Sequence, residues 1–215
     1  VGMEVTSTAV QVFGGMGFIE EAGVSQHFRD MRIAPIYEGT NGIQAMDLVG
    51  RKLAMRMGGV VTDHLDRIRA TVAELAEAGA EFDSMRAELS ASVETLSEVT
   101  NWIMTNGLAD PVEALSGATP YLRIFGIVTG GWLLARQALA AHGELNAGSE
   151  DKGYLSAKIT TARYYAEQHL PQAAGLVPMV QAGSKVLYEV DAETLAYLEL
   201  SGRAARLQEF YGVFA

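Results

Sequence analysis

Residues 82–107, FDSMRAELSASVETLSEVTNWIMTNG, carry the clearest fold signal in the chain. Apolar side chains recur there at steps of three and four residues, interrupted only by Ser92. Because an α-helix turns once in about 3.6 residues, this spacing gathers them on one helical face. The positions are Phe82, Met85, Leu89, Leu96, Val99 and Ile103. The stretch therefore predicts a long helix that ends near Asn106 and Gly107 and packs one face into a core.

Two apolar stripes with the same periodicity precede this stretch. The first consists of Ile43, Met46, Val49 and Leu53. It predicts a helix of about four turns that ends at Gly58 and Gly59. The second consists of Leu65, Ile68, Val72 and Leu75. We expect Thr62 or Asp63 to cap this second helix and Gly79 to stop it.

Proline marks the helices that follow. Asp110 and Pro111 predict the start of a short helix, and Pro120 opens a longer one through residue 141. Within the longer helix, Gly126 and Gly130 predict a face along which a neighbouring helix packs closely.

The C-terminal part also has helical periodicity after a polar, glycine-rich loop over residues 142–153. Helices are expected over residues 154–171 and 172–183. Asp191 is expected to cap a last helix. That last helix carries Leu195, Leu198 and Leu200.

The expected fold is all-α, because no segment alternates as a β-strand does and no internal repeat is present. Up-and-down helical bundles with short connections fit this pattern. The glycine-rich segments precede residue 58, and long plain helices follow it. We therefore expect a division into residues 1–57 and residues 58–215.

The charge of the chain excludes several classes of partner. It has 26 acidic and 16 basic side chains, a formal net charge of -10. Phosphate backbones and anionic lipids repel such a chain, so we expect no nucleic-acid binding and no membrane-surface role. The apolar run over residues 122–141 contains Arg123 and Arg136, which indicates a buried helix and no membrane span.

The chain contains no cysteine. Disulfides, thiolate catalysis and cysteine metal sites are therefore excluded, and redox chemistry requires a bound cofactor. The composition favours a cytoplasmic protein. We expect no signal peptide, and we expect the chain to continue a longer protein, because Val1 falls in mid-pattern.

No metal site is predicted from the histidines. His27, His64, His142 and His169 lack the spacing of metal ligands. We interpret all four as surface or structural residues.

Residues 11–18, QVFGGMGF, form a first candidate motif. The glycine spacing is similar to a dinucleotide fingerprint, but no strand precedes it, so that interpretation fails. Two interpretations stay open. A helix ends here at a tight turn, or the bare backbone at Gly14 and Gly15 lets a flat or phosphorylated ligand approach closely.

Residues 36–44, IYEGTNGIQ, form a second candidate motif around Glu38. A lone glutamate in a polar loop is usually only solvated. Here Ile36 and Tyr37 are expected to exclude water from it, and residues 39–41 offer free backbone N–H groups at a helix entrance. Burial disfavours the charged form of a carboxylate, which makes it a better base. Glu38 is therefore a candidate general base.

The two motifs, with EEAGVSQHFRDMRIAP between them, resemble the C-terminal signature of the acyl-CoA dehydrogenase family. The resemblance covers roughly residues 1–57. The later segment YLRIFGIVTGGWLLARQALAA resembles the extra helical C-terminal domain of longer bacterial members. The chain thus resembles the C-terminal part of such a member.

That resemblance implies FAD-dependent dehydrogenation of acyl-CoA thioesters between Cα and Cβ. Glu38 matches the base that removes the α-proton, and its backbone N–H would help polarise the thioester carbonyl. Gly39 would lie against the substrate. The positions that would contact FAD are Thr40, Asn41 and Gly42, together with Gln11, Gly14 and Gly15 at the FAD of a neighbouring subunit. Many members carry a polar side chain where this chain has Gly42.

The resemblance also implies partners. These are an acyl-CoA substrate, an electron-transfer flavoprotein as electron acceptor, and further copies of the chain in a homo-oligomer, a dimer or tetramer. Family members bind most of the flavin and the CoA through domains that this chain does not include. We therefore expect the isolated chain to bind little or no FAD and to be inactive.

Two alternatives remain open from the sequence. An acyl-CoA oxidase shares the base and the α,β-chemistry but passes electrons to oxygen. Residues 58–215 form, in the other alternative, a non-catalytic helical module that covers the active-site entrance or mediates assembly.

Overall fold

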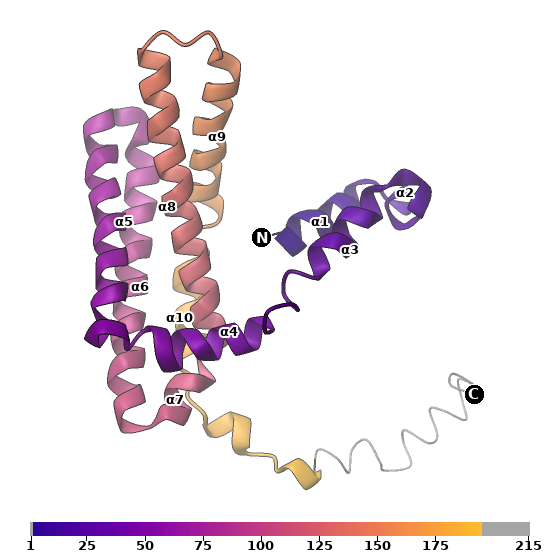
Figure 1. The fold of residues 1–215 in the computed structure, drawn as a ribbon, viewed down its shortest axis with the longest axis vertical. Helices are drawn as coiled ribbons and strands as arrows, with labels where there is room; N and C mark the ends of the chain where they lie inside the picture. Colours follow the sequence, from indigo (N-terminus) through magenta and orange to yellow (C-terminus); the bar gives the residue numbers. More distant parts are fainter. Residues whose placement is uncertain (1, 195–215) are drawn as a thin grey trace. The chain divides into compact units, whose positions relative to one another are not determined.

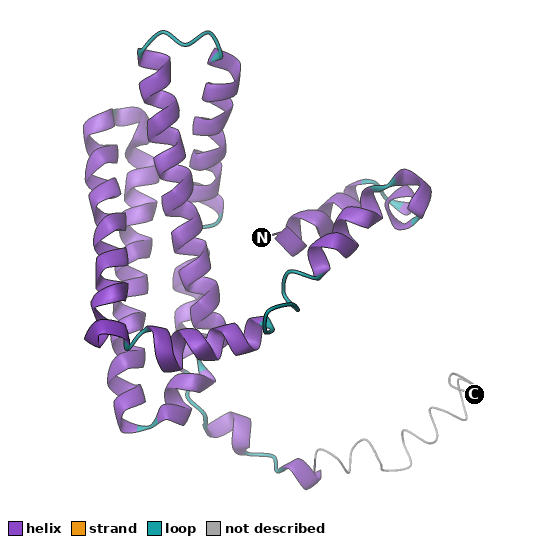
Figure 2. Ribbon diagram, in the orientation of Figure 1, coloured by secondary structure: helices purple, strands orange, loops and turns teal. Residues whose placement is uncertain are grey.

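The structure, a computed structural model, describes residues 2–194. Within that range every regular element is a helix and none is a β-strand (Figure 2). The all-α prediction is therefore confirmed. The chain divides into two compact units, Val1–Val60 and Val61–Ala215.

The first unit is built on helices α1 and α3, which pack against each other along their length (Figure 1). The two helices are antiparallel. Gly2 at the start of α1 lies against Met31 near the end of α3, and a Cβ on Gly2 would approach the Met31 sulfur to 2.2 Å. The elements are α1 (Gly2–Val12), α2 (Gly15–Phe18), η1 (Glu20–Ala22), α3 (Val24–Arg32), α4 (Asn41–Asp47), the π-helical turn η2 (Leu48–Lys52) and η3 (Met55–Gly58).

The segment after α4 differs from the predicted helix of four turns. It passes into the π-helical turn η2, where the Leu53 N–H donates to the Leu48 carbonyl at 3.0 Å. Arg56 and Met57 then adopt left-handed φ angles of 52° and 55°. An α-helix cannot continue through left-handed residues, because its hydrogen-bond ladder requires right-handed φ and ψ. The helix therefore breaks before Gly58, and a new one begins at Gly59.

The second unit is an up-and-down helical bundle, as predicted (Figure 1). Helices α5, α6 and α8 run up and down beside one another, and α9 followed by α10 completes the bundle against α6 and α8. The elements are α5 (Gly59–Ala78), η4 (Ala80–Phe82), α6 (Asp83–Ala109), α7 (Pro111–Ser116), α8 (Ala118–Asn146), α9 (Lys152–Gln168), α10 (Gln172–Gln181) and η5 (Lys185–Tyr188).

The predicted face of α6 forms the centre of this bundle. The six apolar residues singled out from the sequence are each at most 2% exposed. The interruption at Ser92 is also buried, and the Ser92 hydroxyl donates to the Leu170 carbonyl at 3.3 Å. A buried hydroxyl is tolerated when it is hydrogen-bonded. The helix continues to Ala109, slightly past the predicted end.

Helix α5 starts earlier than predicted. It begins at Gly59, so neither Thr62 nor Asp63 caps it, and Gly79 follows its end as expected. The earlier start places Val61, which is 6% exposed, one turn before Leu65 on the buried face. Burying one more apolar side chain favours this extra turn.

One position of the α5 face was predicted wrongly. Thr71 is 3% exposed, whereas Val72 is only half-buried. The Thr71 hydroxyl accepts a hydrogen bond of 2.9 Å from the Trp132 indole N–H on α8. This bond satisfies both polar groups at the contact between the helices.

Gly126 and Gly130 of α8 do not form the single close-packing face that was predicted. A Cβ on Gly126 would meet nothing within 4 Å, so the prediction of close packing is wrong there. A Cβ on Gly130 would come within 2.8 Å of the Tyr165 hydroxyl, and one on Gly131 within 2.5 Å of Leu170. The close approach is confined to Gly130 and Gly131, where α9 and the turn after it lie against α8.

The remaining helix boundaries follow the sequence with small shifts. The Asp110 carboxylate caps α7 by accepting from the Val112 N–H at 2.9 Å. Helix α8 begins before Pro120 and ends at Asn146, inside the predicted loop. Asp191 accepts from the Thr194 N–H at 2.6 Å, as a cap does. The leucines of the helix predicted beyond Asp191 lie outside the described residues.

By length and composition alone, α8 could cross a membrane. A core helix of a soluble protein meets the same criterion. In its most apolar window, 44% of the residues are buried inside the protein.

Candidate functional site

The first motif surrounds the end of α1. Gln11 is exposed in its last turn, and the Gly14 N–H donates to the Gln11 carbonyl at 3.1 Å. This bond confirms the predicted tight turn. A Cβ on Gly14 or Gly15 would meet nothing within 4 Å, so both leave bare backbone at the surface. Packing requires glycine elsewhere, at Gly17, where a Cβ would lie 2.2 Å from the Val10 carbonyl oxygen.

Glu38 lies in the turn between α3 and α4 in a left-handed conformation. Its φ is 55°, and Gly39 follows with a φ of 85°. For a residue with a Cβ, this conformation costs about 1–2 kcal/mol relative to the right-handed one. Non-glycine residues in such conformations occur often at functional sites and persist only where surrounding contacts hold them.

Two hydrogen bonds hold the turn. The Gln44 side-chain amide donates to the Glu38 carbonyl at 2.7 Å, and the Asn41 N–H donates to the Pro35 carbonyl at 3.2 Å. A Cβ on Gly39 would approach the Gln44 amide nitrogen to 3.3 Å. Gly39 is therefore glycine both because of its φ and because Gln44 lies close to it.

Thr40 forms the entrance to α4. Its hydroxyl accepts from the Ile43 N–H at 3.4 Å, and its carbonyl accepts from the Gln44 N–H at 2.9 Å. Thr40, Asn41 and Gly42 are all exposed in this first turn. A side-chain oxygen that caps a helix in this way fixes the direction in which the chain enters it.

The free N–H groups are placed one residue earlier than predicted. The Asn41 N–H is bound to Pro35, so it is not free. The N–H groups of Glu38, Gly39 and Thr40 have no acceptor among residues 2–194. Three unpaired donors therefore accompany the Glu38 carboxylate in the same turn.

The expected shielding of Glu38 is wrong for this chain. The Glu38 side chain is exposed, and Ile36 and Tyr37 are themselves 47% and 53% exposed. The Ile36 and Tyr37 N–H groups both donate to the Ile33 carbonyl, which holds a turn whose side chains lie at the surface. Neither neighbouring side chain therefore excludes water from the carboxylate.

The two motifs lie at opposite ends of α3 (Figure 1). Gly14 and Gly15 precede its first residue, and Glu38 follows its last. A helix of this length spans about 13 Å. The structure therefore does not bring the two motifs together within one chain.

A cluster of charges follows α4. The Asp47 carboxylate accepts from Arg51 at 2.5 Å and pairs with Lys52 at 2.8 Å. The hydrogen bonds from Arg51 and Lys52 hold the pKa of the Asp47 carboxyl well below its usual range. These charges bridge α4 and η2, at the opposite end of α4 from the turn that carries Glu38.

Over residues 2–194 no three His, Asp or Glu side chains gather to hold a metal ion. An open groove of about 440 Å³ lies on α1 and α3 and includes none of the predicted site residues. It is lined by Met3, Glu4, Ser7, Thr8 and Phe28.

The sequence assigned no role to Gln44, although it lies in the second motif. Its side-chain amide donates to the carbonyl of the strained Glu38, and this contact is seen only in the structure. One feature of the sequence could have indicated this role. Gln44 stands six residues after Glu38, in the first turns of the predicted helix that follows Gly39.

Both parts of the chain match known protein families. Residues 64–191 match the family described as "Acetyl-CoA dehydrogenase C-terminal like". Residues 1–54 match the family described as "Acyl-CoA dehydrogenase, C-terminal domain". Because the first match alone covers more than half of the chain, the chain belongs to the acyl-CoA dehydrogenase family.

Several curated relatives carry names from this family. The chain is 41% identical over 172 residues to the 3-methylmercaptopropionyl-CoA dehydrogenase of Ruegeria pomeroyi, an alignment of 80% of this chain and 29% of the relative. It is 32% identical over 194 residues to a butyryl-CoA dehydrogenase of Syntrophomonas wolfei, with 87% and 31% covered.

A third relative is the broad-specificity linear acyl-CoA dehydrogenase FadE5 of Mycobacterium tuberculosis. The chain is 27% identical to it over 194 residues, an alignment of 85% of this chain and 31% of the relative. The chain thus spans about a third of the length of the curated relatives it matches.

Proposed function

We propose that the gene product to which this chain belongs is an FAD-dependent acyl-CoA dehydrogenase, with Glu38 as the base that removes the α-proton. The geometry of Glu38 carries this proposal. Its carboxylate is exposed, its backbone is held in a left-handed turn, and its N–H has no acceptor among the described residues. A base and a hydrogen-bond donor on one residue suit a reaction that removes a proton beside a carbonyl.

The α-proton of a thioester is weakly acidic, so a base alone is insufficient. As the Cα–H bond breaks, its electron pair moves toward the carbonyl, and negative charge develops on the carbonyl oxygen. The Glu38 N–H donates to that oxygen while the Glu38 carboxylate accepts the proton. Donors placed where charge develops lower the barrier strongly, because they need no reorganisation during the reaction.

The residues of both motifs fit a flavin. Gly14 and Gly15 expose backbone with open space where a Cβ would be, and residues 40–42 present an exposed helix entrance. FAD, when bound, supplies the acceptor for the hydride that leaves Cβ. Gln11, Gly14 and Gly15 would contact it on one side and Thr40, Asn41 and Gly42 on another. Gly42 contributes only backbone there.

The two motifs lie at opposite ends of α3, and the family resemblance implies that the first motif contacts the FAD of a neighbouring subunit. The first motif of one copy would serve the FAD held by another. Electrons would pass from the reduced flavin to an electron-transfer flavoprotein.

The decisive experiment compares the full-length gene product with its Glu38→Gln variant. We expect the wild type to contain FAD and an acyl-CoA to bleach its oxidised-flavin absorbance in the absence of oxygen. Glu38→Gln keeps the shape of the side chain and removes the base, so it should retain FAD and lose bleaching. Normal bleaching by the FAD-bound variant would refute the assignment.

Two further measurements address the alternatives. Stoichiometric peroxide formation during turnover would identify an oxidase. Stoichiometric FAD in purified residues 1–215 would contradict our expectation that this chain alone binds little or none.

The bundle of the second unit contains none of the predicted site residues, and we infer that it stabilises the assembled enzyme. Deleting residues 61–215 from the full-length protein should therefore change its oligomeric mass. An unchanged mass with an altered preference for acyl-chain length would instead indicate that the bundle covers the substrate entrance.

A further inference from the structure

We propose that Gln44 is the positioning residue for Glu38, and that its side-chain amide holds the turn that directs the Glu38 carboxylate. This inference rests on the proposed function, because it gives a role to a residue that acts through the base. Gln44 itself contacts no reacting atom in this proposal.

The first observation is the bond itself. The Gln44 Nε2 atom donates to the Glu38 carbonyl oxygen at 2.7 Å and so closes a ring across residues 38–44. The bond fixes the peptide plane between Glu38 and Gly39. That plane sets ψ of Glu38 and φ of Gly39, and the Gly39 φ of 85° is one of the two left-handed φ angles in this turn.

The second observation is that Glu38 requires such support. A left-handed φ of 55° is unfavourable for a residue with a Cβ and persists only where contacts impose it. The Glu38 side chain makes no hydrogen bond or ion pair with any residue over 2–194. The side-chain bond to Glu38 that could impose this conformation comes from Gln44.

The third observation is that Gln44 is itself anchored. Its N–H donates to the Thr40 carbonyl at 2.9 Å within α4, and the next residue, Ala45, is fully buried. The helix therefore carries Gln44 on a fixed backbone. Gly39 leaves room for the amide, since a Cβ there would lie 3.3 Å from the Gln44 nitrogen. A rigid element thus positions a catalytic group on a loop.

The test uses two variants of Gln44 in the full-length, FAD-bound gene product. Gln44→Met keeps the length of the side chain and removes the donor. Gln44→Asn keeps the amide and shortens its reach, so it also loses the bond. Gln26→Met is the matched control, because Gln26 is an exposed helical glutamine of α3 whose side chain bonds to no residue that the structure describes.

The main readout isolates proton transfer. With the flavin reduced beforehand by dithionite, it cannot accept a hydride, and deuterium uptake at Cα from D₂O measures removal of the α-proton by the base. We expect both Gln44 variants to exchange roughly 10- to 100-fold more slowly than the wild type, because small displacements of a catalytic group have effects of this size. FAD content and the KM for acyl-CoA should change little, and Gln26→Met should match the wild type.

The outcomes separate this inference from the proposed function. Wild-type exchange with normal exchange in either Gln44 variant would overturn the positioning role and leave the function standing. Loss of FAD or of thermal stability with an unchanged exchange rate per bound flavin would show a merely structural role and also overturn it. A wild type that neither exchanges the α-proton nor bleaches with any acyl-CoA would instead overturn the proposed function.

Discussion

The carboxylate of Glu113 on α7 binds both the backbone and the side chain of Ser184, 71 residues later in the chain. It accepts from the Ser184 N–H at 3.3 and 3.2 Å and from the Ser184 hydroxyl at 2.5 Å. Gly183, with a φ of 76°, brings the backbone toward Glu113. This contact joins α7 to the segment that follows α10 and secures one end of the bundle.

Glu113→Ala should destabilise the bundle by about 1–2 kcal/mol, because it leaves two partly buried donors without an acceptor. Glu113→Gln keeps one acceptor oxygen and should cost less. Urea unfolding followed by tryptophan fluorescence measures this, since the two tryptophans, Trp102 and Trp132, both lie in the second unit. Equal stability of the wild type and Glu113→Ala would show that the contact contributes nothing.

Gly126→Ala and Gly130→Ala should change stability in opposite directions. Gly126 has open space at its Cβ position inside a helix, so alanine there should stabilise the bundle by about 0.5–1 kcal/mol. At Gly130 a Cβ would lie 2.8 Å from the Tyr165 hydroxyl, and alanine should destabilise by about 1–3 kcal/mol. Thermal unfolding of both variants measures the difference, and a shift of the same sign in both would contradict the packing described here.

Removing either hydroxyl of the Thr100 and Tyr121 pair should have unequal effects. The Thr100 hydroxyl donates to the Leu96 carbonyl at 2.6 Å, so the Tyr121 hydroxyl donates to Thr100 at 2.7 Å. Tyr121→Phe leaves an acceptor unpaired and should cost about 0.5–1.5 kcal/mol. Thr100→Val leaves a fully buried Tyr121 hydroxyl without its partner and should cost about 1–3 kcal/mol.

The double variant, Thr100→Val with Tyr121→Phe, tests the coupling of this pair. It should be more stable than the sum of the two single losses predicts, because no buried polar group is left unpaired. Strictly additive losses in urea unfolding would mean that the two hydroxyls do not interact.

The stability of the second unit should fall in mild acid because of His64. Its ring stacks on Phe125 with centroids 5.0 Å apart, and burial, followed by the charge of Arg67, lowers the pKa of His64. The folded state therefore favours neutral His64, and the unfolded chain binds the proton more readily. Stability is complete above the unfolded pKa of about 6.5 and declines as the pH falls below it toward the folded pKa.

His64→Phe should reduce this pH dependence, as measured by urea unfolding above and below about pH 6.5. His27→Gln provides the control, because His27 is exposed on α3 of the first unit. An identical acid response in His64→Phe and the wild type would remove His64 as the cause.

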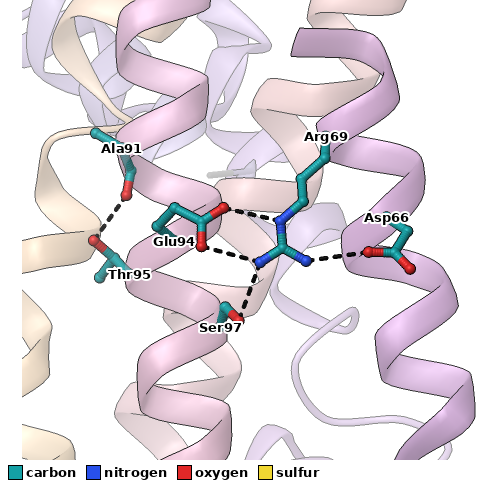
Figure 3. Close-up of polar contacts among 6 residues, drawn as sticks. All are labelled: Asp66, Arg69, Ala91, Glu94, Thr95 and Ser97. Carbon is teal, nitrogen blue, oxygen red and sulfur yellow. Dashed lines mark hydrogen bonds and ion pairs between the residues drawn. The ribbon is translucent and has the colours of Figure 1, made fainter. Parts of the chain in front are cut away.

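Arg69 joins α5 to α6 by a two-point contact with Glu94 (Figure 3). Its guanidinium donates to the two carboxylate oxygens at 2.9 and 3.0 Å, and to Asp66 at 3.1 Å. The bond from Arg69 lowers the pKa of Glu94. This contribution is therefore present at neutral pH and is lost as the pH falls below about 4.5.

Arg69→Lys should destabilise the bundle by no more than about 1 kcal/mol, because lysine cannot make the two-point contact and the pair is largely exposed. Added salt should shrink the difference between variant and wild type. A difference in unfolding free energy that does not respond to salt would indicate that the effect comes from packing of the arginine stem.

The helices and their core faces could be predicted from the sequence because periodicity is a local property. The apolar face of α6 is buried as predicted, and Asp110 and Pro111 start α7 where expected. The predictions fail where the local sequence is compatible with more than one backbone conformation or more than one packing neighbour. The left-handed Arg56 and Met57 break the predicted helix, and Gly126 differs from Gly130 only in which neighbour lies beside it.

The order and spacing of the two motifs, which the sequence alone determined, were sufficient to suggest the family and to single out Glu38. Only the tertiary structure decided how Glu38 is held. Its left-handed turn, its bond from Gln44 and its exposure depend on how the chain closes between α3 and α4. Likewise, the contact of Glu113 with Ser184 depends on where α7 and α10 meet. Residue types and their spacing specify local conformation, whereas a contact between distant residues such as Glu113 and Ser184 depends on the packing of whole helices.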